Sequence, residues 1–204
     1  ALGVLLRLGN LLVDLAHRGR IALGLGFAHV EAGLRSFNRK MPEEVNRILT
    51  DHLATLLLAP TGTAMAHLAR EGVPAERCHL VGDVMYDSVL QLGPRAGEAR
   101  AILARAGLQA GHYVLATIHR AENTDSLDQL MAILTGLAEV SSEVPVVLPL
   151  HPRTRAMLSQ SGHLADVGTR LRLIEPVGYL DMLALERDAS LVVTDSGGVQ
   201  KEAF

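Results

Sequence analysis

A regular alternation between short aliphatic runs and longer helical patterns constrains the fold of this chain more than any other feature. The short runs are rich in Leu, Val and Ile, as buried strands are. The candidate strands are Phe27–Glu31, Leu56–Pro60, Cys78–Gly82, Tyr113–Ile118, Pro145–Leu150, Arg170–Glu175 and Leu191–Asp195. The runs predict sheets that are covered by helices on both faces.

Helices are predicted between these strands, where apolar residues recur at spacings of three and four. The clearest such stretches are Pro42–Ala54, Thr61–Glu71, Leu127–Val140 and Tyr179–Arg187. Helix ends are marked at Gly72, which Pro74 follows, and at Gly107, which closes Glu98–Ala106. Because strands and helices alternate, the chain is predicted to have an α/β fold with parallel sheets.

The length and one interrupted helical pattern indicate two domains. A chain of 204 residues is long for one ordinary domain and short for two complete ones. The expected boundary lies within Gln91–Gly97, where Gly93-Pro94 interrupts a helix and the charge rises. We therefore expect residues 1–94 and 95–204 to belong to two doubly wound domains that face one cleft.

Composition excludes several classes of protein. Hydrophobic residues make up 49% of the chain and charged residues 20%, which is enough to bury a core and argues against disorder. A net charge of -3 gives no basic field for nucleic acid, although a few local donors are enough to bind a small anion. The single cysteine, Cys78, cannot form an internal disulfide, which fits a reducing cytoplasm.

Residues 1–25 are rich in Leu, Val, Ala and Gly but are not expected to enter a membrane. Polar residues such as Arg7 and Asp14 break the run, which stays short of the ~20 apolar residues that a membrane span needs. The segment also lacks the basic start and the small-residue cleavage site of a signal peptide. The chain has no initiator Met and stops at Phe204, so we expect it to be a fragment.

Polar clusters fall where predicted strands end. They are His29-Val30-Glu31, His119–Asn123, His151-Pro152-Arg153 and Asp195–Gly198. Ligands of open parallel sheets bind beyond the carboxyl ends of the strands, so these clusters form the candidate site.

No pair among the nine histidines shows the HExxH spacing of a zinc site, so no metal is predicted. Gly24-Leu25-Gly26 lacks the third glycine of a dinucleotide fingerprint, and no redox cofactor is predicted.

The last cluster joins an apolar strand to two glycines and a helix-compatible run. Gly197 and Gly198 would let backbone N–H groups approach a phosphate, and a helix start would add the positive end of its dipole. Ser196 can donate a hydrogen bond to the same oxygens, and Glu202 in the following helix can accept one from ribose hydroxyls. The alternative is an ordinary strand-to-helix turn with Ser196 as its N-cap.

Carboxylates follow the first predicted strand and open the next helix. Glu31 comes directly after an apolar strand, where partial burial would suit it to proton transfer. Glu43 and Glu44 follow Pro42 at a helix start, where the helix dipole alone explains acidic residues.

Basic residues end two later strands. His119 and Arg120 follow one of them, and His151 and Arg153 follow the next. Such groups bind phosphate or exchange protons. Taken singly, each histidine is explained more simply as an exposed loop residue or a helix cap.

In their order along the chain, these segments are more specific than any one of them. HVEAGLRS, MPEEVNRILTDHLA, LLLAPT, VGDVMYDSV, ATIHRAEN, PLHPRTR and VTDSGGVQKEA follow one another between Phe27 and Phe204. Together they resemble the non-hydrolysing UDP-N-acetylglucosamine 2-epimerase family. The resemblance implies the glycosyltransferase-B architecture, with two Rossmann-like domains, both incomplete in this chain, and the nucleotide sugar between them.

The resemblance also implies a reaction and a set of site residues. The family interconverts UDP-GlcNAc and UDP-ManNAc by eliminating UDP to leave a 2-acetamidoglucal and adding it back. Glu31 and Glu44 are then acid/base or sugar-positioning carboxylates, and His119 lies beside the phosphates and the sugar. The diphosphate and the ribose are assigned to Ser196, Gly197, Gly198 and Glu202. Candidates of second rank, some for a regulatory second substrate molecule, are Arg120, Asn46, Arg47, His151 and Arg153.

Departures from the family pattern keep other functions open. The family's opening Gly-Thr-Arg-Pro-Glu segment and the Gly-Asp-Thr turn are absent, and with them one expected catalytic aspartate. This chain alone is therefore not expected to turn over substrate. A hydrolysing relative that releases ManNAc and UDP, and a non-catalytic UDP-sugar-binding module, are the alternatives. The resemblance further implies a cytoplasmic homodimer that serves cell-surface polysaccharide synthesis.

Overall fold

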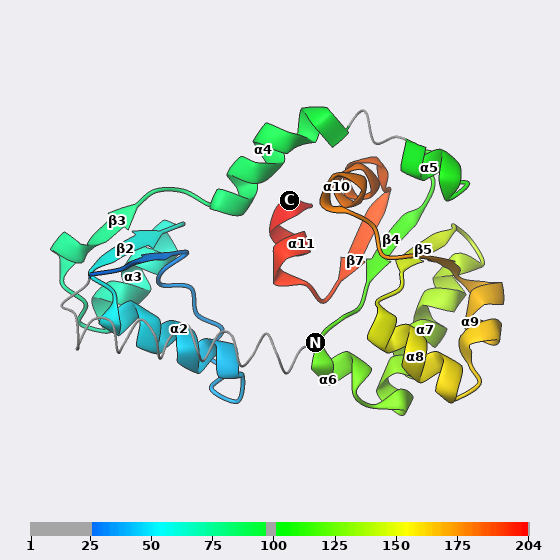
Figure 1. Ribbon diagram of the computed structural model, residues 1–204, viewed down its shortest axis with the longest axis horizontal. Coiled ribbons are helices and arrows are strands. Elements are labelled where there is room, and N and C mark those ends of the chain that lie inside the picture. Colours follow the sequence, from blue (N-terminus) through cyan, green and yellow to red (C-terminus); the bar gives the residue numbers. More distant parts are fainter. Residues whose placement is uncertain (1–25, 97–100, 204) are drawn as a thin grey trace. The chain divides into compact units, whose positions relative to one another are not determined.

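The computed structural model describes residues 26–96 and 101–203 (Figure 1). Residues 1–25, for which neither a membrane segment nor a signal peptide is expected, lie outside the described residues. The chain divides into two compact units, one up to Val84 and the other from Met85 onward. No helix among the described residues is long and apolar enough to cross a membrane.

The first unit contains a three-stranded parallel sheet in the order β1-β2-β3. Its elements are β1 (Ala28–Val30), α2 (Pro42–Leu53), β2 (Leu56–Ala59), α3 (Gly62–Arg70), the 3-10 helix η1 (Ala75–Arg77) and β3 (Cys78–Leu80). Leu57 and Ala59 from β2 pack with Ala64 and Leu68 from α3 in a core of small and aliphatic side chains. The predicted alternation of strand and helix is confirmed in this unit.

The second unit contains a four-stranded parallel sheet in the order β6-β5-β4-β7. Its strands are β4 (Val114–Thr117), β5 (Val146–Pro149), β6 (Arg172–Ile174) and β7 (Leu191–Thr194). Its helices are α4 (Val84–Ala96), α5 (Ala101–Arg105), α6 (Ala121–Thr124), α7 (Leu127–Ser141), α8 (Pro152–Gln160), α9 (Leu164–Arg170), α10 (Tyr179–Asp188) and α11 (Gly197–Glu202).

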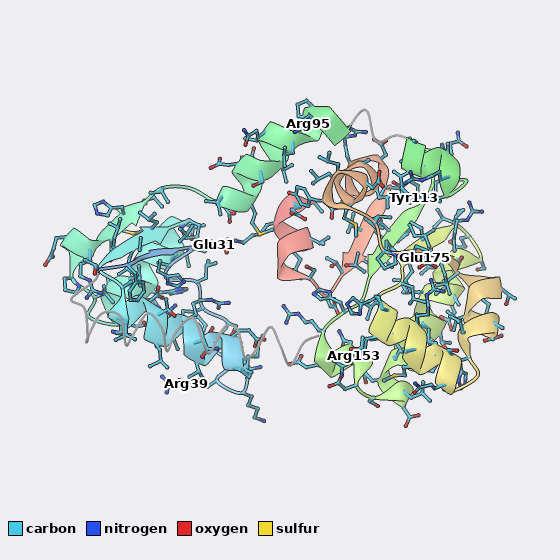
Figure 2. All side chains as sticks on the ribbon, in the orientation of Figure 1. Glu31, Arg39, Arg95, Tyr113, Arg153 and Glu175 are labelled. Carbon is cyan, nitrogen blue, oxygen red and sulfur yellow. The ribbon has the colours of Figure 1, made fainter. Side chains whose placement is uncertain are left out.

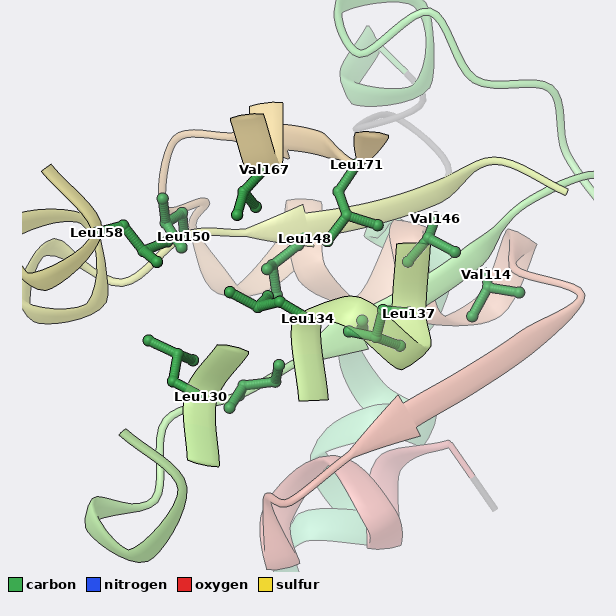
Figure 3. Close-up of a cluster of buried hydrophobic side chains, with 12 residues drawn as sticks. Val114, Leu130, Leu134, Leu137, Val146, Leu148, Leu150, Leu158, Val167 and Leu171 are labelled. Atoms are coloured by element: carbon green, nitrogen blue, oxygen red, sulfur yellow. The ribbon is translucent and has the colours of Figure 1, made fainter. Parts of the chain in front are cut away.

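Alternate residues of the central strands face two separate cores in the second unit. Val114 and Ala116 of β4 point to the side covered by α7, α8 and α9, where Leu134 and Leu148 are buried (Figure 3). Leu115, between them, points to the opposite core with residues of α5 and α10. The period-two pattern of a strand therefore places helices on both faces, as the sequence predicts.

The interruption predicted at Gly93-Pro94 is wrong. α4 runs from Val84 to Ala96 with Pro94 inside it. Pro94 lies in the last turn, so the N–H that it lacks removes only the bond to the Leu90 carbonyl and leaves the earlier turns of the helix intact. The division of the structure into units falls at the start of α4, after Val84, whereas the limits of 1–94 and 95–204 also place residues 85–94 with the first domain.

The order of strands reverses beside β4. The chain passes from β4 to β5 and β6 on one side and then returns to β7 on the other. Thr117 and Thr194 are paired at the ends of β4 and β7, and their hydroxyl oxygens lie 2.6 Å apart. The carboxyl ends of these strands form the topological switch point, where open α/β sheets bind ligands.

Candidate functional site

One carboxylate joins the two loops at the switch point. Asp195, directly after β7, accepts hydrogen bonds from the backbone N–H groups of His119 and Arg120 at 3.0–3.2 Å. It also accepts from Asn123 Nδ2 at 2.9 Å, and His119 Nδ1 lies 2.9 Å from its Oδ1. Burial works against ionisation of this carboxyl, but the bonds from Asn123, Arg120 and His119 outweigh it and lower its pKa. The loop after β4 is thus fixed to the loop after β7.

The glycine turn follows this carboxylate. Ser196 is the N-cap of α11, and its hydroxyl accepts from Val199 N at 3.3 Å, so the N-cap interpretation of Ser196 is confirmed. Arg120 Nη2 lies 3.9 Å from the point that a Cβ on Gly197 would occupy. The Arg120 guanidinium therefore lies beside Gly197. A guanidinium and the N–H groups at a helix start both favour an anion. The structure brings together the predicted residues His119, Arg120, Ser196 and Gly197.

His151 and Arg153 occupy the next strand end. His151 is the N-cap of α8 and accepts from Arg153 N at 3.2 Å. The Arg153 guanidinium, labelled in Figure 2, lies 2.5 Å from Asp125 Oδ1, and both side chains are about half exposed. The simpler interpretation of His151 as a cap is confirmed.

Glu202 lies in α11 beside a cavity of about 640 Å³ that α4, α10 and β7 also line. Burial, together with a hydrogen bond to Glu202, raises the pKa of Tyr179 to about 12. Glu186 of α10 lines the same cavity, and both its carboxylate oxygens are buried without a partner among the described residues. Burial, with the charge of Glu202, raises the pKa of Glu186 to about 8.

Replacing Glu186 by Gln is expected to stabilise the protein by roughly 1–3 kcal/mol at pH 9, with little effect at pH 5. The folded carboxyl keeps its proton up to about pH 8, whereas an unfolded one loses it near pH 4. The free energy of unfolding of the wild type therefore falls as the pH rises between these values, and an amide abolishes this loss. Urea unfolding from pH 4 to 9 measures it. The same change at exposed Glu175 is the control, and parallel profiles for Glu186→Gln and the wild type would contradict the prediction.

In the first unit, Glu31 (labelled in Figure 2) follows β1 directly and begins a turn that packs against α3. The turn contacts a buried network of charged side chains that centres on Asp51. Arg35 Nη1 lies 2.7 Å from Asp51 Oδ2, and its Nε and Nη2 donate to Glu71 at 2.7 Å. His29 Nδ1 lies 2.6 Å from Asp51 Oδ1. Glu31 belongs to this unit and Ser196 to the other, and a shared cleft stays a prediction.

Glu44 is buried, although it lies in the first turn of a helix. Its carboxylate accepts from the backbone N–H groups of Ser36 and Phe37, from the Ser36 hydroxyl and from Arg47 Nη1, all at 2.9–3.0 Å. Burial opposes ionisation, but the bonds from Ser36, Phe37 and Arg47 outweigh it and lower the pKa of Glu44. A carboxylate that is held ionised by four donors suits the positioning role better than proton transfer. Arg47 also contacts the Leu34 carbonyl, and Asn46 lies half-buried on the same helix.

Glu44→Gln is expected to lower the free energy of unfolding by roughly 2–4 kcal/mol, because an amide loses the charge and turns one donor toward other donors. Glu43→Gln is the matched control. Glu43 is the exposed neighbour in the same first turn, so its change should cost about 0.5 kcal/mol or less. Urea unfolding of both variants at pH 7 measures the difference, and equal losses would show that the loop does not depend on Glu44.

Two carboxylates are at the centre of these networks. Asp195 belongs to the last predicted cluster but has no predicted role, and Asp51 is not predicted at all. A usable signal exists for each. Asp195 follows an apolar strand directly, which is the criterion that selected Glu31. Asp51 lies seven residues after Glu44, which places both on one face of α2, and a charge on a buried helix face indicates a buried network.

Comparisons with known proteins identify the family of the chain. The family model described as UDP-N-acetylglucosamine 2-epimerase matches residues 20–204. UDP-2,3-diacetamido-2,3-dideoxy-D-glucuronate 2-epimerase of Pseudomonas aeruginosa is 48% identical over 185 residues, which cover 89% of this chain and 50% of the relative. UDP-N-acetylglucosamine 2-epimerase of Methanococcus maripaludis is 41% identical over 188 residues, with 89% and 51% covered.

Solved structures give the same result. The crystal structure of the Methanocaldococcus jannaschii UDP-GlcNAc 2-epimerase in complex with UDP-GlcNAc and UDP matches with a TM-score of 0.82 and 41% identity. The match covers 92% of this chain and 53% of that one, and the chain spans about half the length of the curated relatives it matches. The predicted fold class, Rossmann-like α/β units of the glycosyltransferase-B type, is confirmed. The chain belongs to the UDP-N-acetylglucosamine 2-epimerase family.

Proposed function

We propose that the intact protein is a non-hydrolysing 2-epimerase that interconverts UDP-GlcNAc and UDP-ManNAc. The observation that carries the proposal is the arrangement of hydrogen-bond donors and a guanidinium at the switch point. There Asp195 holds the loop of His119 and Arg120 against the glycine turn. The family match and the relatives named UDP-N-acetylglucosamine 2-epimerase support a 2-epimerase activity. The protein is further proposed to act as a cytoplasmic homodimer in cell-surface polysaccharide synthesis.

The proposed reaction places charge at two points. A carboxylate removes the proton from C2, the C1–O bond breaks, and UDP leaves with the bonding electrons, so that a 2-acetamidoglucal remains. A proton is then delivered to the other face of C2, and UDP adds back at C1. Glu31 exchanges the proton on one of these two faces, while His119 and Arg120 stabilise the departing diphosphate.

The remaining residues bind and position the substrate in this proposal. Ser196, Gly197 and Gly198 hold the diphosphate at the start of α11, and Glu202 accepts from the ribose. Glu44, with Asn46 and Arg47, shapes the loop beside the sugar. His151 and Arg153, at the end of β5, are proposed to contact a second, regulatory substrate molecule.

Isotope exchange tests the proposal. Intact protein incubated with UDP-GlcNAc in deuterated water should replace the C2 proton by deuterium and form UDP-ManNAc. Accumulation of free ManNAc would instead identify the hydrolysing alternative. Binding of UDP-GlcNAc with an inert C2–H bond would identify the non-catalytic module.

A second substrate is favoured by one relative. The Pseudomonas aeruginosa protein, at 48% identity, is named for the 2-epimerisation of UDP-2,3-diacetamido-2,3-dideoxy-D-glucuronate. Both sugars carry the leaving UDP and the acetamido group at C2, so the same elimination serves both. Comparing kcat/KM for the two substrates decides between them. A ratio above about 100 in favour of either assigns the specificity.

A further inference from the structure

The turn after β1 holds Glu31 in an unusual backbone conformation. Glu31 has φ +62°, and Gly33, two residues later, has φ +78°. The left-handed region costs a residue with a Cβ roughly 1–2 kcal/mol, and such strain persists only where the surroundings enforce it. At Gly33 a Cβ would lie 2.4 Å from the Ala64 carbonyl oxygen, so the turn is pressed against α3.

A single buried carboxylate holds both sides of this turn. Asp51 is fully buried on α2. Its Oδ2 accepts from Gly33 N at 3.0 Å, and its Oδ1 lies 2.6 Å from Nδ1 of His29. His29 precedes Glu31 by two residues and Gly33 follows it by two. Asp51 therefore holds the ring of His29 before Glu31 and the backbone N–H of Gly33 after it.

The carboxylate is kept ionised by its surroundings. Burial opposes ionisation, but the bonds from His29, Arg35 and Gly33 outweigh it and lower the pKa of Asp51. Arg35 is itself buried and braced by Glu71 through a two-pronged pair. An ionised carboxylate can only accept, so Nδ1 of His29 carries the proton in this contact.

We propose that Asp51 is the positioning residue of this site. It enforces the left-handed conformation of Glu31 and fixes the His29 ring with its proton on Nδ1, so that the Glu31 carboxylate is presented in one orientation. The conformational part stands on the contacts of the first unit alone. The catalytic consequence rests on the proposed function.

A stability cycle tests the conformational part without any activity measurement. Glu31→Ala and Glu31→Gly both remove the carboxylate and differ only in the Cβ that the left-handed region penalises. Glycine should raise the folding equilibrium constant over alanine by roughly tenfold. In an Asp51→Asn background the turn can relax, and this advantage should fall below about threefold. The proposal is overturned if the advantage of glycine over alanine at position 31 is the same in the Asp51→Asn background. It is also overturned if this advantage is absent when Asp51 is present.

Phe37 supplies the matched control. It is the other described non-glycine residue with positive φ, at +57°, and its side chain is largely exposed. Its backbone N–H donates to Glu44. The advantage of glycine over alanine at position 37 should therefore be the same in the wild-type and the Asp51→Asn backgrounds. A fall at position 37 as large as that at position 31 would indicate general loosening of the unit and overturn the proposal.

A second measurement covers the case in which Asp51→Asn does not fold. Nitrogen NMR of His29 in the wild-type protein reports which ring nitrogen carries the proton. A proton on Nδ1 is expected, because the ionised Asp51 accepts there. A neutral ring with its proton on Nε2 overturns the proposal.

The activity arm uses the intact protein. Asp51→Asn should lower kcat by roughly 100-fold while KM stays within about threefold, because the acid/base group is misplaced and the diphosphate contacts lie in the other unit. Equal losses in kcat and in substrate binding would indicate general damage and overturn the positioning role. If the wild type itself is inert, the proposed function fails, and the stability cycle still decides the conformational part.

Discussion

Replacing Glu31 by Gln is expected to lower kcat of the intact protein by roughly 10²–10⁴-fold. Glutamine keeps the size of the side chain and its place after β1, but it cannot take a proton from C2. Substrate binding should change by less than about threefold, since the diphosphate is assigned to the second unit. Loss of the C2 proton to deuterated water, followed by proton NMR, measures the step directly.

Glu76→Gln is the control for this change. Glu76 is an exposed carboxylate in η1 of the same unit, so its replacement should leave kcat within about twofold. Wild-type exchange in Glu31→Gln would reject Glu31 as the group that moves the proton. The site would then need another acid/base group.

Asp195→Asn is expected to lower the free energy of unfolding by roughly 2–4 kcal/mol and to weaken UDP binding by roughly 10–100-fold. The asparagine Oδ1 can still accept from some of the donors on His119, Arg120 and Asn123. Its Nδ2 group is a donor itself, so the remaining donors lose their acceptor. The loop after β4 should then lose its fixed position beside the glycine turn. Urea unfolding and calorimetric titration with UDP measure the two effects.

The free energy of unfolding of this variant should also depend on pH differently from that of the wild type. The pKa of Asp195 is lowered in the folded protein, so the stability it contributes is present above the ordinary aspartate value of about 3.9 and is lost as the pH falls through the folded value. The Asp195→Asn variant should not show this part of the loss of stability at low pH. Asp125→Asn, at an exposed ion pair with Arg153, is the control and should cost about 0.5 kcal/mol or less. Equal losses in the two variants would contradict the role of Asp195.

The strands can be predicted from the sequence because buried parallel strands are nearly continuous aliphatic runs. Each observed strand lies inside a predicted one, as Val114–Thr117 lies inside Tyr113–Ile118. Helices with a clear apolar face, such as Leu127–Ser141, agree with the prediction to within a residue or two. α8 and α9 give a weaker signal, because α8 is mostly polar and α9 is short. The prediction at Pro94 is wrong because a proline in a last turn has the same local signature as a helix break.

The site can be predicted only in part. Residues at strand ends are found because parallel topology gathers them at one edge, and His119, Arg120, Ser196 and Gly197 do lie together. The burial of Glu44 cannot be predicted, because a first-turn carboxylate is explained equally well by the helix dipole. Its partners, Ser36 and Phe37, come from a loop whose path depends on tertiary contacts.

The hydrogen bonds by which Asp195 joins the two loops have a consequence for protein engineering. Both loops at the switch point share one acceptor, so neither segment is an independent module. Consider a chimaera in which residues 118–123 come from a relative and residues 194–198 stay unchanged. The imported loop would then have to bind an Asp195 that is held by the original second loop. Exchanges intended to alter nucleotide preference should therefore transplant the two segments as a set.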